Sequence, residues 1–348
     1  MLQQLSYRLK KYVSTGYLNM MRAFPFLLFF FPVHAATAQI DSLYIQPFEQ
    51  NFSLRTYFIQ HYTSVFQDFS VDGHDDFEYR TNRPVSIGLG ISWNNSSISG
   101  SYGFPFLRDR KKGKTHTLAF QYHYYGRKLV FDFAFQKHKG MYKFDGEDES
   151  VFEVTPDTKV SQYGVTGQYV FNGNRFSYKA AFDLSEVQLR SVGSFILGGS
   201  LYKNRIDAEG PIIVTNPKGK TDSISEIQKN IQIGVNVGYA YSWVIKKRFF
   251  AAVSMTVGFN VGTESINKLH SKPELYPSFN PRVALGYHGK EWSVSTSFFD
   301  NHVYTFYSDN MSRGISTMSL QMTIVKRFGK QPRVFDRVPN IPSLHNSF

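Results

Sequence analysis

The sequence predicts an all-β protein, a single antiparallel transmembrane β-barrel of about 12 strands. Three observations predict it: an export signal near the N-terminus, apolar residues at every second position, and tight turns that alternate with long loops. Aromatic residues make up 17% of the chain, which excludes a disordered protein. Cysteine is absent, which excludes disulfide scaffolds and thiolate metal sites, and we expect no cofactor.

The first segment has the composition of a signal peptide. Arg22 precedes an apolar stretch over 23–33, and Ala36-Thr37-Ala38 forms a small-residue cleavage site before Gln39. The apolar stretch is too short for a membrane helix, which needs roughly 20 residues. A buried helix is the structural alternative. We assign residues 1–38 to the signal, with Met20 or Met21 as alternative starts, and expect export to the outer membrane of a Gram-negative bacterium.

The clearest strand pattern lies over 231–243, where apolar residues alternate with small polar ones. It predicts that Val235 and Val237 face lipid while Asn236 and Gly238 face the lumen. Similar alternation recurs over 85–93, 98–104, 118–124, 129–136, 162–171, 249–259 and 318–324.

The polar face of these strands distinguishes a membrane barrel from a soluble sandwich. Exposed strands of soluble proteins carry many Lys, Glu and Thr, whereas this face consists of Gly, Ser, Asn, Gln and Ala. The apolar face also carries aromatic residues near strand ends, as the interfacial girdle of a membrane barrel does. These residues are Trp93, Tyr124, Tyr241, Trp243 and Trp292.

Loop lengths predict the topology. Tight turns at 94–96, 125–128, 172–174, 245–248 and 288–291 alternate with longer segments at 69–83, 105–115, 144–158, 204–228, 262–280 and 307–314. Short turns belong in the periplasm and long loops outside, which requires an even number of strands. Segment 175–203 counts as one crossing kinked around Ser185–Arg190, and 10 or 14 strands are alternatives. The barrel then covers residues 39–328, and 329–348 form a periplasmic tail.

Several strings resemble a Gram-negative family of predicted outer-membrane barrels known as domain of unknown function 4421. The strings lie at 102–107, 125–132, 139–142, 176–182 and 191–198. One departure is Thr81, where the family pattern would place a proline before Asn82. The resemblance implies the fold and the location. It implies no catalytic residue, because the family has no established activity.

Two groups of residues are candidates for chemistry. If Tyr124 pairs with Leu129, His123 and Asp132 become diagonal neighbours in the lumen, as a hydrolase would require. We favour a structural hydrogen-bond network there and assign no catalytic residue. Near His74, an acidic cluster could bind Ca²⁺, but its spacing matches no ordered calcium loop, so no metal site is assigned. The cluster consists of Asp72, Asp75, Asp76 and Glu78.

The net charge of +12 points to anionic partners. Nucleic acid is excluded, because the cations sit at turns and the chain is exported. The densest cationic cluster lies in the 105–115 loop, where we expect it to dock on lipopolysaccharide phosphates. It consists of Arg108, Arg110, Lys111, Lys112 and Lys114. An ordinary solvated loop is the alternative. The barrel-insertion machinery is a second expected partner, because the last strand ends at an aromatic residue, Phe328.

The function expected from the sequence is binding or small-solute passage at the cell envelope. A barrel of this size has a lumen much narrower than that of a 16-stranded porin. Two alternatives stay open, a barrel-embedded hydrolase that acts on lipid or glycan, and an accessory subunit of an envelope assembly.

Overall fold

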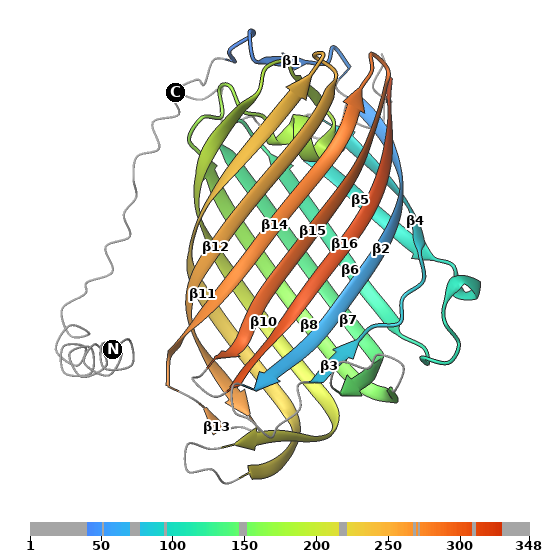
Figure 1. Ribbon diagram of the computed structural model, residues 1–348, viewed down its shortest axis with the longest axis vertical. Helices are drawn as coiled ribbons and strands as arrows, with labels where there is room; N and C mark the ends of the chain where they lie inside the picture. The colour runs from blue at the N-terminus through green and yellow to red at the C-terminus, as the bar shows by residue number, and fades with distance from the viewer. Residues whose placement is uncertain are drawn as a thin grey trace, which may run out of the picture. The chain divides into compact units, whose positions relative to one another are not determined.

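The computed structural model describes residues 40–50, 52–69, 77–93, 96–145, 152–215, 221–266, 269–270, 272–307 and 311–328. Long antiparallel strands form a closed ring in this part of the chain (Figure 1), which confirms the predicted fold class. The ring contains β2 (Phe52–Phe69), β4 (Ser86–Trp93), β5 (Ser96–Gly103), β6 (His116–Tyr125), β7 (Leu129–Asp145), β8 (Glu153–Val170), β10 (Val192–Thr215), β11 (Thr221–Ile245), β12 (Phe249–Ile266), β14 (Glu274–His288), β15 (Trp292–Tyr307) and β16 (Met311–Phe328).

The ring closes between its first and last strands. β16 pairs with β2 along its whole length, from Met311 opposite Phe69 to Phe328 opposite Phe52. Each other strand of the ring pairs with the ring strands before and after it in the sequence, so the sheet has no free end. Closure matters because an open sheet edge would leave backbone groups unpaired in the membrane.

Six short elements accompany the ring. β1 (Ile45–Pro47) pairs with β9 (Glu186–Gln188) in a separate two-stranded sheet. β3 (Phe77–Arg80) bridges β2 and β7, and β13 (Leu269–His270) extends β12. The remaining two are a 3-10 helix, η1 (Pro105–Leu107), and a π-helix, η2 (Lys179–Asp183). Among the described residues, no helix is both long and apolar enough to span a membrane.

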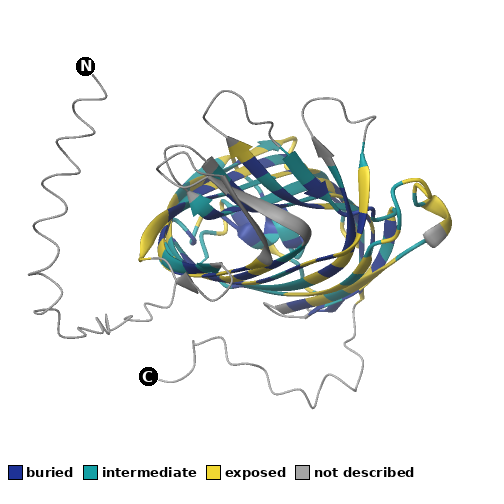
Figure 2. Ribbon diagram, turned by 90° about the horizontal axis from the view of Figure 1, so that it is seen from below, coloured by how far each residue is buried: buried dark blue, intermediate teal, exposed yellow. Residues whose placement is uncertain are grey.

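Side chains point where the alternation predicts. Val235 and Val237 are 58% and 46% exposed, whereas Asn236 is 2% exposed. Buried and exposed residues alternate along the strands in the view from below (Figure 2). Other residues of the exposed apolar belt are Leu89, Leu118, Phe195, Ile233, Leu285 and Leu320. A wall that is apolar outside and polar inside is the arrangement of a membrane barrel.

The aromatic residues predicted for the girdle gather at the short-turn end. Trp243 precedes the turn at 246–248 and Trp292 follows the turn at 289–291, and both are exposed. Tyr124 and Tyr241 are half-buried beside turns at the same end. The side chain of Trp93 lies outside the described part of the chain.

The segment 175–203 departs from the prediction. It is not one kinked crossing, because β8 ends at Val170 and β10 begins at Val192, both at the short-turn end. Between them the chain folds into the barrel as η2 and β9. Phe176, Tyr178 and Ala181 are buried there instead of facing lipid. Because this segment returns to the short-turn end where it started, it adds no crossing, and the number of strands stays even.

Two predicted long loops are also shorter than expected. Most of 204–228 belongs to the β10–β11 hairpin, and much of 262–280 belongs to β12 and β14. These strand extensions are rich in polar residues, so their alternation of apolar and polar side chains is weak. The hairpin ladder runs from Val192 opposite Ser242 to Thr215 opposite Thr221, with one irregularity between Asp207 and Pro211.

Adjacent residues on β16 provide a test of the facing assignment. Leu320 is 53% exposed on the outer surface, whereas Gln321 lines the interior. Arginine on the lipid-facing side near mid-membrane costs about 2–4 kcal/mol. We therefore expect Leu320→Arg to lower folding stability in lipid vesicles far more than Gln321→Arg, measured by urea titration. Equal losses would contradict the assigned faces.

Candidate functional site

The barrel encloses a cavity of about 210 Å³. It is lined by residues of β2, β5 to β8, β10 and β14 to β16, and Phe182 of η2 contributes from one end. Period-two alternation explains this lining, because the same strands that place apolar residues in lipid place Ser, Gln, Arg and His inside. The cavity is therefore lined by hydrogen-bonding groups and charges, beside apolar side chains such as Ile59, Phe135 and Phe299.

His123 and Asp132 meet directly in this cavity. Tyr124 pairs with Phe131 and not with Leu129, so His123 lies opposite Asp132 in the β6–β7 ladder. The distance between His123 Nδ1 and Asp132 Oδ1 is 2.5 Å. The expectation of a diagonal pair was therefore wrong by two residues of register, because Tyr125 pairs with Val130 and the turn lies one residue further along the chain than assumed.

Arg282 joins this pair from the far side of the barrel. It lies on β14, opposite β7 in the ring, and its Nη2 donates to Asp132 Oδ2 at 2.6 Å. A buried charge is stable only when it is paired and hydrogen-bonded. Asp132 thus forms an ion pair that spans the lumen.

A second contact crosses the lumen from β7. Gln136 Nε2 donates to Thr317 Oγ1 on β16 at 2.7 Å and to Gln162 Oε1 at 2.8 Å. Tyr202 of β10 also reaches Asn301 of β15, with 3.4 Å between Tyr202 Oη and Asn301 Oδ1. These contacts reduce the free cross-section of a barrel that is already narrow.

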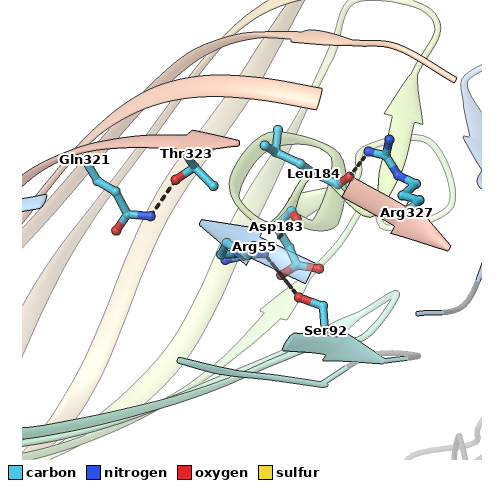
Figure 3. A network of polar contacts seen from close by, with 7 residues as sticks. All are labelled: Arg55, Ser92, Asp183, Leu184, Gln321, Thr323 and Arg327. Carbon is cyan, nitrogen blue, oxygen red and sulfur yellow. Dashed lines mark hydrogen bonds and ion pairs between the residues drawn. The ribbon is translucent and has the colours of Figure 1, made fainter. Parts of the chain in front are cut away.

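At the short-turn end, the segment 176–188, which we call the plug, fills the barrel. Arg55 of β2 pairs with the Asp183 carboxylate and donates to the Asp183 carbonyl at 2.8 Å. Ser92 Oγ also contacts Asp183 Oδ1, at 3.3 Å. Arg327 of β16 donates to the carbonyl of Leu184 (Figure 3). Two wall arginines thus hold the C-terminal end of η2.

Glu186 provides a second anchor of the plug. Its buried carboxylate pairs with Arg127 from the β6–β7 turn, and Lys179 Nζ lies 3.5 Å from Glu186 Oε1. Ser177 Oγ donates to Glu186 Oε2 at 2.6 Å. Burial, together with the nearby charge of Arg127, lowers the pKa of Lys179 to about 8. Lys179 and Asp183 therefore lie on the plug inside the barrel and not on the crossing strand predicted for 175–203.

The cationic loop follows β5 as predicted, and its members differ in surroundings. Arg110, Lys111 and Lys114 are exposed, whereas Arg108 is half-buried. Lys112 packs on aromatic rings inside the protein, with its Nζ 4.9 Å from the ring centroid of Tyr142. Only part of the cluster is therefore free to meet an external anion.

The predicted acidic cluster falls largely outside the described part of the chain, which omits Asp72, Asp75 and Asp76. Glu78 is described, and its Oε2 lies 2.8 Å from Arg80 Nη2. Within the described ranges, no group of three or more His, Asp or Glu side chains is placed to hold a metal ion.

Two residues of the site escaped the sequence analysis. Ser97 lies opposite His123 in the β5–β6 ladder, so Ser97, His123 and Asp132 form one row across three strands. Arg83, in the coil before β4, lines the cavity. The row depends on ladder register, and the coil carries no alternation, so neither position had a signal in the sequence.

Comparisons with solved structures return outer-membrane proteins with low similarity. The outer membrane protease OmpT of Escherichia coli is 10% identical with a TM-score of 0.39, over 80% of this chain and 97% of that one. The β domain of the Bordetella autotransporter BrkA is 8% identical with a TM-score of 0.35, over 82% and 100%. The COG4313 outer membrane channel of Pseudomonas putida F1 is 9% identical with a TM-score of 0.27, over 81% and 97%.

Sequence comparison is more informative than these structural likenesses. No curated protein matches the chain. One family matches residues 39–328, which include the whole ring from β2 to β16 and the plug. The chain therefore belongs to the family described as Domain of unknown function (DUF4421).

Proposed function

We propose that this protein is an outer-membrane barrel that binds a small polar ligand in its lumen cavity. Its plug restricts the passage of solutes through the lumen. The observation that carries the proposal is a cavity lined by hydrogen-bonding groups and bordered by a plug that buried ion pairs hold in place. The exposed apolar belt supports the membrane location. The proposed signal, residues 1–38, and the tail, 329–348, lie outside the described residues.

Binding explains the interior better than free diffusion. An open pore needs a continuous aqueous path, whereas here Asp132–Arg282 and Gln136–Thr317 cross the lumen. The plug obstructs the lumen at the short-turn end. Its charged anchors are buried away from water and hold it in place. Breaking a buried ion pair by removing one partner costs about 3–5 kcal/mol, so the plug leaves only under a strong driving force.

The cationic loop supports lipopolysaccharide phosphate as a partner. A membrane-spanning strand has roughly 9–11 residues, and β4 and β5 have eight each, so the loop after β5 leaves the wall near the outer membrane surface. Phe106 is 74% exposed beside the cations. An exposed apolar side chain next to Arg110, Lys111 and Lys114 fits a lipid surface better than bulk water.

A hydrolase that acts on lipid or glycan is the second candidate, favoured by the row Ser97–His123–Asp132. Against it, the Ser97 hydroxyl has no hydrogen-bond partner among the described residues, and Asp132 is shared with Arg282. Labelling by a fluorophosphonate that disappears in Ser97→Ala would support the hydrolase. No labelling would favour the binding role. An accessory subunit would be revealed by co-purification of an envelope partner.

Loosening the plug should convert a closed barrel into a conducting one. The double variant Asp183→Asn/Glu186→Gln removes both anchoring charges and leaves the wall intact. We expect wild-type protein to show little steady conductance in planar bilayers and the double variant to show frequent openings. Asp207→Asn is the control, because its ion pair with Arg205 is exposed on β10.

The folded state of each variant is checked by the heat-dependent shift of a closed barrel in SDS gels. Strong conductance of the wild type would contradict the proposed closure. A double variant that folds and stays closed would show that the cross-lumen contacts, and not the plug, form the barrier.

Removing the exposed loop cations should weaken the contact with lipopolysaccharide. Each Lys or Arg near an anionic surface contributes about 1 kcal/mol. We expect Arg110→Ser/Lys111→Ser/Lys114→Ser to lower thermal stability in lipopolysaccharide-containing membranes and not in neutral detergent. Lys112→Ser is the control, because its ring contact predicts a loss in both media. A triple variant that loses nothing in either medium would leave the loop without a lipid role.

A further inference from the structure

The barrel wall is incomplete between β5 and β6. Their ladder has three residue pairs, which join 96–98 to 122–124 at the short-turn end. Beyond these pairs, the facing edges of 99–103 and 116–121 have no ladder partner among the described strands. The other edges of both strands stay paired, with β5 bound to β4 up to Gly103 and β6 bound to β7 from His116.

The opening has a fixed frame. Asn82 Nδ2 donates to the carbonyls of Asp109 and Gly113, at 2.6 and 2.7 Å, and so holds the loop that joins β5 to β6. Thr115 Oγ1 accepts from Asn82 N at 2.8 Å and donates to the Gly140 carbonyl at 2.7 Å. On the long-loop side of this connection, β3 bridges β2 and β7. Because hydrogen bonds hold the chain around the gap, the gap is an ordered feature of the fold and not a frayed strand edge.

The gap communicates with the lumen cavity. Ser99 and Ser101 of β5 and Ala119 and Gln121 of β6 line that cavity. Ala119 and Gln121 are exposed, although the alternation turns them inward. A Cβ added at Gly100 would meet no atom within 4 Å. The interior therefore reaches the outer surface of the wall at this point.

The membrane-facing border of the gap is apolar. Tyr102 on β5 is 65% exposed, and Leu118 on β6 is 62% exposed. Unpaired backbone groups are not stable against hydrocarbon and are tolerated only where they line a water-filled cavity or protein. The free edges of β5 and β6 thus require water or the polar part of a ligand inside the gap, next to lipid tails outside it.

One positive charge inside the cavity is available to a ligand. The guanidinium of Arg83 has no hydrogen bond or ion pair among the described residues, and it interacts electrostatically with His61 and His138. The other two arginines of the cavity, Arg55 and Arg282, are paired with aspartates. Asp300 also lines the cavity, and its Oδ1 accepts from Ser316 at 2.9 Å.

From these features we infer that the gap between β5 and β6 is a lateral portal, through which an amphiphile with an anionic headgroup enters the cavity from the outer leaflet. The headgroup meets Arg83 and the unpaired strand edges, while the acyl part stays beside Tyr102 and Leu118. The exposed cations of the 105–115 loop attract such molecules to the entrance. The inference rests on the proposed lumen-binding function and identifies the polar ligand of the cavity as the headgroup of an amphiphile.

The absence of native cysteine allows a direct test of the portal. A bimane label on Gln121→Cys lies at the portal, and the same label on Gln321→Cys lies in the same cavity on a fully paired strand. In phosphatidylglycerol vesicles that carry nitroxide on the acyl chain, we expect strong quenching at 121 and little at 321. Equal quenching at both positions would overturn the portal.

A disulfide pair checks that the gap is real. Ser101→Cys/Ala119→Cys places two cysteines across it, and Ala284→Cys/Ser297→Cys places two at directly paired positions of β14 and β15. We expect the control pair to oxidise readily and the portal pair to stay reduced, because a disulfide needs its Cα atoms within about 7 Å. Oxidation of both pairs at the same rate would show a closed ladder and overturn the portal.

The ligand class is tested by binding of phosphatidylglycerol to the purified barrel in neutral detergent. Loss of a charge-assisted contact in Arg83→Gln should weaken binding about tenfold. Arg205→Gln, which changes an exposed side chain on β10, should leave binding unchanged. Equal binding of phosphatidylcholine would overturn the anionic headgroup. The plug conductance experiment reports on closure of the lumen and not on the portal, so a failed portal leaves the proposed plugged barrel standing.

Discussion

The structure depends on one constraint: a backbone polar group in hydrocarbon must find its partner within the protein. The closed ring from β2 to β16 satisfies this constraint along nearly the whole wall. Closure with outward apolar residues forces the polar residues inward, where they in turn need partners. The cross-lumen contacts of Asp132 and Gln136 follow from that need as much as from any function.

The same logic explains the plug. Residues 176–188 bring apolar side chains and two carboxylates into a space that strand residues alone would leave wet. The apolar part packs on the inner wall, where Leu184 clusters with Phe250 and Val325. The carboxylates of Asp183 and Glu186 are matched by Arg55 of the wall and Arg127 of the β6–β7 turn, because an unpaired charge there would cost several kcal/mol. Packing and charge pairing together make the segment part of the barrel.

Local sequence patterns predicted the local features of the structure, namely its strands, their faces and its tight turns. Period-two alternation located the strands and their faces, and turn residues located the short-turn end, because both are properties of neighbouring residues. The pairing of His123 with Asp132 was misjudged because a one-residue shift of the turn changes the register of the whole hairpin. Ser97 was not found because it pairs with His123 across a long loop. The plug was missed for a related reason, since the apolar residues around Tyr178 fit a lipid-facing strand as well as a buried segment. Arg83 lies in a coil whose position is set by β3, an element with too few residues to leave a pattern.

The unequal height of the wall has a consequence for the surrounding bilayer. β4 and β5 have eight residues each, whereas β10 and β11 on another part of the ring have 24 and 25. Lipids beside the low side meet a hydrophobic surface shorter than their own thickness, and a bilayer responds to such mismatch by thinning locally. We therefore expect the bilayer next to β4 and β5 to be thinner than elsewhere around the barrel. A lipid there is already partly displaced from its leaflet before it touches the protein interior.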